Sequence, residues 1–167
     1  MRCQLTIKHG EKHHQNIMDK LTFLKEELVA KLTSLDSNTL PVFGKMNVHQ
    51  MIEHMAYAFR QASGLIPLPP ANDEDTTDKM YQFMISEKPF RDNTPNQYLP
   101  DTPSPTNYTT VAESLMHLQI DIDYFISVFS DDKEKRILNP FFGNLNADEW
   151  IHLLHKHAMH HLRQFGL

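Results

Sequence analysis

The segment VAESLMHLQIDIDYFISVF, residues 111–129, has the apolar periodicity that decides the fold. Its apolar side chains recur every three or four residues, at Val111, Leu115, Leu118, Ile122, Phe125 and Phe129. Because an α-helix has about 3.6 residues per turn, this spacing places one apolar stripe on one face of a helix. Thr110 and Glu113 form the sequence pattern of a capping box at its start. The segment therefore predicts an amphipathic helix that packs against other helices.

Three further stretches have the same periodicity, and all-α is the fold class that they indicate. Their apolar positions are Ile17, Leu21, Leu24, Leu28, Leu32 and Leu35; Val48, Met51, Ile52, Met55, Phe59 and Ala62; and Trp150, Leu154, Ala158 and Phe165. Asn47 with Gln50, and Asn146 with Glu149, repeat the capping-box pattern. Strand signals are nearly absent. Four such helices bury their stripes most simply in a four-helix bundle.

The connection between the second and third helices, residues 66–109, is long and rich in proline. It holds eight of the ten prolines, at positions 67, 69, 70, 89, 95, 100, 103 and 105. A connection of this length suits a crossover across the end of the bundle, which lets the second and third helices run parallel, with one short helix from Asp75 to Ser86. The alternative is a linker between two domains, but neither half alone has four stripes. We therefore expect one domain, 1–167, with the crossover as a candidate lid.

Four side chains of this crossover are candidates for enclosing a small anionic or thiol-bearing substrate, namely Phe90, Arg91, Tyr98 and Tyr108. The alternative for each of them is ordinary packing on the surface of the bundle.

Composition and charge exclude several classes of protein. The chain has 167 residues, of which 40% are hydrophobic and 22% charged, and its formal net charge is −5. A negative overall charge disfavours nucleic acid and anionic membranes as partners. A single cysteine, Cys3, cannot form an internal disulfide, and residues 1–11 lack the apolar core of a secretory signal. We expect a cytoplasmic globular protein.

Histidines are the unusual feature of the composition, since the chain has 11 and five of them lie between His152 and His161. At 100° per residue, His157 and His161 fall on the core-facing side of the last helix, one turn apart. By the same arithmetic His152 points outward, His155 lies on a flank and His160 lies on the opposite margin. Only His157 and His161 are thus expected to face the bundle interior.

Two inward imidazoles need partners, because each neutral ring keeps one donor and one acceptor nitrogen away from water. A divalent metal ion satisfies an i,i+4 histidine pair, as in zinc-protease helices. The alternative is that the rings hydrogen-bond each other or a carboxylate. A third ligand would come from the second helix, where His49 and His54 lie on opposite margins of the apolar stripe. Periodicity favours His54 only weakly.

Two segments resemble the DinB-like superfamily, in particular an uncharacterised bacterial branch of it. They are GKMNVHQMIEHM, residues 44–55, and HAMHHLRQ, residues 157–164, and the similarity spans essentially the whole chain. The resemblance implies an up-down-down-up four-helix bundle, often a homodimer. It also implies one divalent metal ion bound by one histidine of the second helix and two of the last, which here are His54, His157 and His161.

The resemblance implies activity only broadly, because the superfamily includes thiol-dependent transferases and isomerases as well as metal-dependent hydrolases. We expect a hydrolase or a low-molecular-weight-thiol transferase acting on a small molecule; the alternative is a non-catalytic module for metal or small-molecule binding or for dimerisation. An all-nitrogen ligand set suits zinc and nickel, with iron and cobalt as alternatives. Gln164 and His160 are candidates for contacting the substrate or orienting a ligand ring. Further candidates for proton transfer are Glu53, Asp121 and Asp123.

Overall fold

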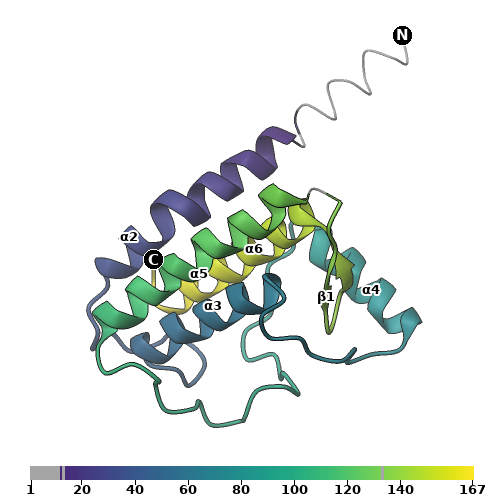
Figure 1. Cartoon of the computed structure of the whole chain (residues 1–167). Coiled ribbons are helices and arrows are strands. Elements are labelled where there is room, and N and C mark those ends of the chain that lie inside the picture. The colour runs from purple at the N-terminus through teal and green to yellow at the C-terminus, as the bar shows by residue number, and fades with distance from the viewer. Residues whose placement is uncertain (1–11, 13, 133) are drawn as a thin grey trace.

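A computed structural model describes residues 12, 14–132 and 134–167 of the chain and is mostly helical (Figure 1). Residues 14–22 are α-helical and continue directly into η1 (Phe23–Glu27) and α2 (Leu28–Thr33). The elements that follow along the chain are α3 (Val48–Ala62), α4 (Glu74–Ile85), α5 (Val111–Asp131), β1 (Ile137–Asn139), β2 (Gly143–Leu145) and α6 (Ala147–Gln164). The expectations for Cys3 and for residues 1–11 concern a part of the chain outside the described residues.

The helix starts predicted from the sequence are confirmed. The side chain of Asn47 accepts a hydrogen bond from the Gln50 amide, and the side chain of Gln50 accepts one from the Asn47 amide. The same reciprocal pair forms at the starts of α5 and α6. Each box satisfies amides that have no partner within the helix. Short-range sequence pattern therefore sets where these three helices begin.

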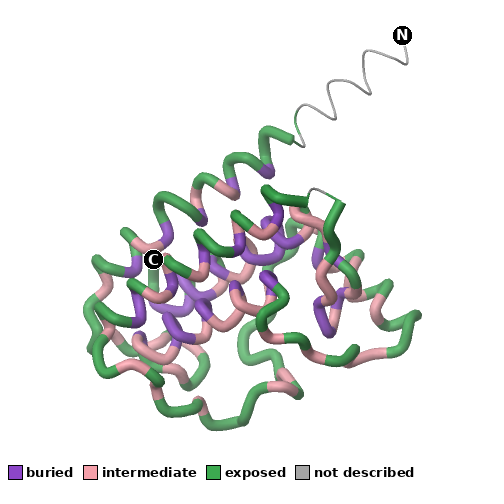
Figure 2. The backbone as a smooth tube through the Cα atoms, in the orientation of Figure 1, coloured by how far each residue is buried: buried purple, intermediate pink, exposed green. Residues whose placement is uncertain are grey.

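The four predicted stripes meet in one hydrophobic core, which Figure 2 shows as buried segments on the facing sides of the helices. The helix α3 packs against α5 and α6, α2 packs against α5, and η1 contacts both α5 and α6. The largest fully buried side chains in this core are Trp150, Phe59, Phe125, Leu24, Leu28 and Leu32. Burial of each such side chain contributes about 1.5–3 kcal/mol to the stability of the fold, so this core fixes α3 and α6 relative to each other.

The crossover forms the expected short helix, α4, and is fastened to α6. The Lys156 ammonium donates to the carbonyl oxygens of Phe83, Met84 and Ser86 at 2.8–3.2 Å. These hydrogen bonds provide partners for carbonyl groups at the C-terminal end of α4, which have none within the helix. Further along, the Arg163 guanidinium pairs with the Asp92 carboxylate at 2.6 Å. These cations belong to the same helix as His157 and His161, so one helix positions both the candidate ligands and the crossover.

The expectation of a purely α-helical fold is wrong at one place, because β1 and β2 form a small antiparallel hairpin. Asn139 begins the turn by accepting from the amides of Phe141 and Phe142, and Gly143 completes it at φ +82°. The Trp150 indole donates to the Ile137 carbonyl at 3.1 Å and so holds the hairpin against α6. Strands of three residues are too short to produce a visible alternation in the sequence.

The helix α5 has 21 residues, a length that could cross a bilayer, but Glu113, Asp121, Asp123 and Asp131 interrupt its apolar positions. In the part of the chain that the structure describes, no helix combines the length and the apolar character that a membrane span requires.

Candidate metal centre

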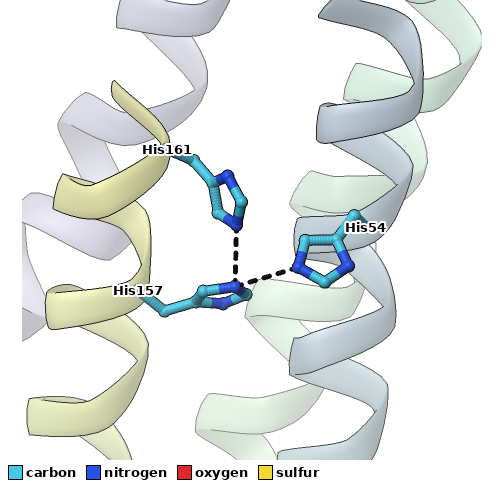
Figure 3. A group of neighbouring side chains, drawn as sticks. All are labelled: His54, His157 and His161. Carbon is cyan, nitrogen blue, oxygen red and sulfur yellow. Dashed lines mark hydrogen bonds between the residues drawn. The ribbon is translucent and has the colours of Figure 1, made fainter. Parts of the chain in front are cut away.

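Three histidines converge between α3 and α6, as Figure 3 shows. His54 reaches across from α3, and His157 and His161 extend from successive turns of α6. The Nε2 atom of His157 lies 3.0 Å from Nε2 of His54 and 2.9 Å from Nε2 of His161. One potential ligand atom of each ring lies within 4.8 Å of those of the other two. The structure therefore brings together the three side chains that the sequence and the resemblance select.

Helix geometry explains this convergence. Residues four apart on a helix lie one above the other on the same face, which directs His157 and His161 to one point. The packing of α3 against α6 provides the third ring, because His54 lies at the margin of the α3 stripe next to buried Met51 and Met55. His54 and His157 are half-buried and His161 is only 4% exposed, so the rings meet where little water reaches them.

Hydrogen bonds among the three rings cannot account for both short contacts of the His157 Nε2 atom. The Gln164 amide donates to the Phe43 carbonyl at 2.7 Å, so its Oε1 atom accepts from Nδ1 of His161 at 2.9 Å. A neutral His161 therefore presents a lone pair at Nε2. The Nε2 atom of His157 carries either one hydrogen or one lone pair, yet it contacts two other Nε2 atoms. At most one of those contacts is a good hydrogen bond, whereas a cation would attract all three lone pairs.

The surroundings keep the three rings neutral. Burial, reinforced by neighbouring histidines, lowers the pKa of His161 to about 3, although its hydrogen bond to Gln164 acts in the opposite direction. Burial together with His160 lowers the pKa of His54 to about 4. Burial and the same group of rings hold the pKa of His157 well below its usual value. Neutral imidazole is the form that binds metal ions, so the protein presents this cluster in its ligating state.

Two of the three separations between ring nitrogens are close to those found around a divalent ion. Tetrahedral nitrogens about 2.0–2.1 Å from zinc are roughly 3.3 Å apart, close to the two short separations in this cluster. Three protein ligands also leave a coordination position open, which is typical of catalytic rather than structural metal sites. The three-histidine cluster is therefore compatible with a metal centre that reaches exogenous ligands.

An apolar cavity of about 650 Å³ lies beside the cluster and is lined by all three rings. Its volume falls in the range of small-molecule sites. The crossover residues Phe90, Arg91 and Tyr98 belong to its lining. Tyr108 does not belong to this lining and instead stacks on His117, with ring centroids 4.0 Å apart and planes 9° apart. The histidine cluster therefore lies in the wall of a cavity that is large enough for a small molecule.

The two polar candidates from α6 both line the cavity. Gln164 is 2% exposed and contacts His161, so its place in the structure is that of an orienting group. His160 is half-buried, with its ring 5.1 Å from that of Phe43 and 6.1 Å from that of Phe90. Burial and the Arg163 charge lower the pKa of His160, which leaves an uncharged base in the cavity wall.

Three other histidines, His49, His152 and His155, lie apart from the cluster. The outward orientation expected for His152 is wrong, because its side chain is 8% exposed and Nδ1 lies 2.8 Å from the Lys20 ammonium. The helix containing Lys20 packs on that side of α6, so α6 is buried on two faces. His155 lies on the flank, as expected, with its ring edge-on to Phe23. His49 contacts Ser114 at 2.8 Å and belongs to a separate polar network.

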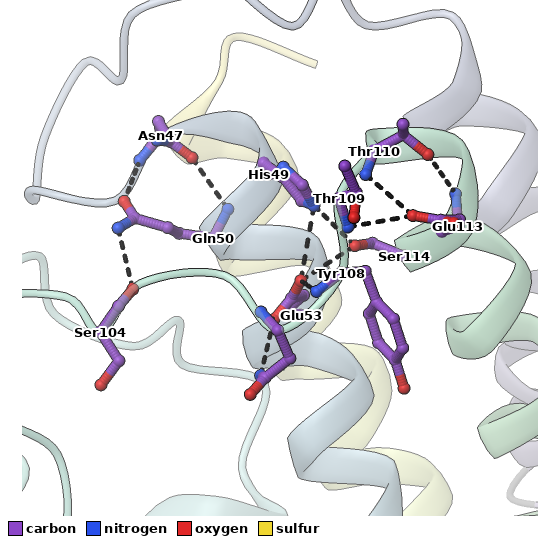
Figure 4. Close-up of polar contacts among 11 residues, drawn as sticks. Asn47, His49, Gln50, Glu53, Ser104, Tyr108, Thr109, Thr110, Glu113 and Ser114 are labelled. Carbon is purple, nitrogen blue, oxygen red and sulfur yellow. Dashed lines mark hydrogen bonds and ion pairs between the residues drawn. The ribbon is translucent and has the colours of Figure 1, made fainter.

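That network is centred on Glu53, which is buried and does not belong to the three-histidine cluster (Figure 4). Its carboxylate accepts from the amides of Asn107 and Tyr108 at 2.7 and 3.0 Å, from the Asn107 side chain and from the Ser114 hydroxyl. Glu53 therefore ties the end of the crossover to α3. The other acidic candidates also lie outside the cavity lining: Asp121 pairs with Arg60 at 3.1 Å, and Asp123 accepts from Gln119.

Sequence reasoning missed Gly44, which lies against the Gln164 side chain that contacts His161. Gly44 has φ +81°, and a Cβ atom built there would overlap the Gln164 amide. The residue thus leaves room for the side chain that fixes the orientation of His161. The one sign of it in the sequence is that Gly44 is the first residue of the segment GKMNVHQMIEHM, which resembles the superfamily.

We expect Gly44→Ala to weaken divalent metal binding by about tenfold, because displacing Gln164 frees the His161 ring, and partners of metal ligands typically contribute 10–100-fold. Equilibrium dialysis against zinc measures the change. Gly166→Ala is the control, since Gly166 also has positive φ but no atom of the described residues lies within 4 Å of its added Cβ. Equal affinities for Gly44→Ala and the wild type would contradict this role for Gly44.

One comparison with known proteins assigns the chain to a family. A family model described as the DinB superfamily matches residues 24–165, which include the three histidines and every helix from α2 to α6. Neither the comparison with curated proteins nor the comparison with solved structures produced a match. The family match covers most of the 167 residues. The chain therefore belongs to the DinB superfamily.

Proposed function

We propose that His54, His157 and His161 bind one divalent metal ion, zinc or nickel, and that the site is catalytic. The observation that carries the proposal is the contact of one His157 nitrogen with two other ring nitrogens, which hydrogen bonding alone does not satisfy. Nitrogen ligands suit both ions. We also propose that the four long helices form the up-down-down-up bundle of the superfamily, which is consistent with the packing of α3 on α5 and α6.

The reaction that the cavity supports best is the transfer of a low-molecular-weight thiol to an electrophile. A divalent ion at such a site lowers the pKa of bound water to about 7 and deprotonates a bound thiol outright. Among the described residues no Asp or Glu lines the cavity, so they offer no carboxylate base beside the cluster. Thiol chemistry needs no such base, and the lining beside the neutral rings is mostly apolar.

Hydrolysis is the second candidate, and His160 is the observation that favours it. Its half-buried ring lines the same cavity and is held uncharged by burial, which suits a group that accepts a proton from water. His160 would then act as the base, and His160→Ala would lower ester hydrolysis without lowering thiol transfer.

The test compares zinc-loaded and chelated protein in two assays, conjugation of cysteine or glutathione to an aryl halide and hydrolysis of a nitrophenyl ester. We expect conjugation to fall by on the order of 100-fold on chelation and in His161→Ala, and to survive in His155→Ala. His155 is the matched control because it lies on the same helix outside the cluster. Conjugation unaffected by chelation, or the absence of both activities from the metal-loaded protein, would contradict the proposal, and the latter result would indicate a binding module.

A further inference from the structure

The geometry points to a class of ligand for the cavity: an amphipathic anion, with an apolar body carrying an aromatic ring and one carboxylate group. This inference rests on the proposed function, because it names the kind of molecule that reaches the metal centre. Two observations support it, namely the aromatic side chains of the cavity wall and the positive charges of the cavity lining.

Aromatic side chains from separate segments form most of the apolar wall. The rings of Phe83 and Phe90 lie 5.8 Å apart, and those of Tyr98 and Phe141 lie 5.7 Å apart. All four line the cavity, together with Trp150. Aromatic pairs at such distances favour the edge or face of another ring, so the wall suits a ligand with an aromatic body.

The charged side chains of the cavity lining are both cationic. They are Lys45 and Arg91, and no carboxylate of the described residues belongs to the lining. The neighbouring Asp92 does not neutralise Arg91, because Arg163 pairs with Asp92 at 2.6 Å. Within the described parts of the chain the Arg91 guanidinium has no ion pair or hydrogen bond of its own. A protein whose net charge is −5 thus presents a local excess of positive charge at this cavity.

The wall is held in place before any ligand binds. The Lys156 ammonium, besides bonding three carbonyls of the crossover, lies 4.4 Å from the centroid of the Phe83 ring and 5.3 Å from that of Phe90. Arg163 reaches the Phe90 carbonyl as well as Asp92. A ligand therefore does not need to order this part of the crossover, which lowers the entropic cost of binding. The carboxylate of the ligand pairs with Arg91, and its ring packs on Phe90 and Tyr98.

The test uses three probes that each have a phenyl group on a four-carbon chain, namely 4-phenylbutyrate, 4-phenylbutanol and 4-phenylbutylamine. Calorimetry gives the affinities, and fluorescence of Trp150, the only tryptophan of the chain, reports binding in the cavity. We expect the carboxylate to bind about tenfold more tightly than the alcohol, and the amine most weakly. Arg91→Gln should abolish the advantage of the carboxylate while leaving the affinity for the alcohol unchanged. Lys88→Gln, an exposed crossover residue outside the lining, is the matched control.

Chelated wild-type protein separates this inference from the metal proposal. Preference for the carboxylate that persists after chelation, and disappears in Arg91→Gln, supports the inference even if no metal binds. Preference that disappears on chelation identifies the metal ion as the partner of the carboxylate and overturns the assignment to Arg91. Equal binding of amine and carboxylate overturns the inference as a whole.

Discussion

His161→Ala is expected to reduce divalent metal binding by on the order of 100-fold, from about one ion per chain to an occupancy that dialysis removes. The variant removes one of three nitrogens and leaves the Gln164 amide without its ring partner. Since His157 contacts the other two rings at 2.9–3.0 Å, loss of one ring opens the cluster to water on that side. Metal analysis of untagged protein after dialysis measures the result.

The control for this prediction is His155→Ala, which removes an imidazole from the same helix without touching the cluster. That variant should retain its ion. His54→Ala tests the contribution of α3 separately and should lose the ion as His161→Ala does. Retention of a stoichiometric ion by both His161→Ala and His54→Ala would show that the ion binds elsewhere, and the ligand assignment would be wrong.

Glu53→Ala is expected to lower the free energy of unfolding by about 3 kcal/mol, because removing the acceptor leaves the buried Ser114 hydroxyl and the partly buried Tyr108 amide without it, and an unsatisfied buried donor costs about 1–3 kcal/mol. The carboxylate accepts four hydrogen bonds, two of them from backbone amides at the end of the crossover. Urea unfolding monitored by circular dichroism measures the change. Asp123→Ala is the matched control, since Asp123 is exposed and accepts only from Gln119 among the described residues, and it should change stability by less than about 0.5 kcal/mol.

The same carboxylate gives stability a pH dependence of known sign. Burial raises the pKa of Glu53, but hydrogen bonds from Asn107, Tyr108 and Ser114 outweigh burial and hold the pKa below its ordinary value of 4.5. A carboxyl whose pKa is lower in the folded state stabilises that state above its unfolded pKa, and this contribution disappears as the pH falls through the folded value. Wild-type stability should therefore decline below about pH 4.5, and Glu53→Gln should flatten part of that decline. An equal decline in Glu53→Gln would contradict this role for the carboxylate.

Local sequence information was sufficient for the helices and for two of the three cluster residues. Capping boxes and apolar stripes depend on residues within one or two turns, so their spacing predicts helix starts and buried faces directly. The same arithmetic directed His157 and His161 inward, where they lie. The choice of His54 over His49 depended on the resemblance, because both residues lie at the margins of one stripe.

Most of the features that sequence reasoning missed depend on contacts between distant segments. His152 is buried because Lys20, 132 residues away, packs on what a single-stripe helix would expose. Glu53 finds its partners 54 to 61 residues along the chain, and two of them, Asn107 and Tyr108, lie in the crossover, which has no periodicity. The hairpin of β1 and β2 is fixed by Asn139, Gly143 and a contact to Trp150. No pattern of period 2 or 3.6 encodes such contacts.

X-ray absorption at the metal edge of the zinc-loaded protein tests the central claim most directly. We predict three imidazole nitrogens at about 2.0–2.1 Å, one further light-atom ligand, and loss of imidazole scattering in His157→Ala. We also predict that the open position takes a sulfur ligand at about 2.3 Å when a small thiol is added. A first shell dominated by carboxylate oxygens, or a spectrum unchanged in His157→Ala, would contradict a metal centre built from His54, His157 and His161.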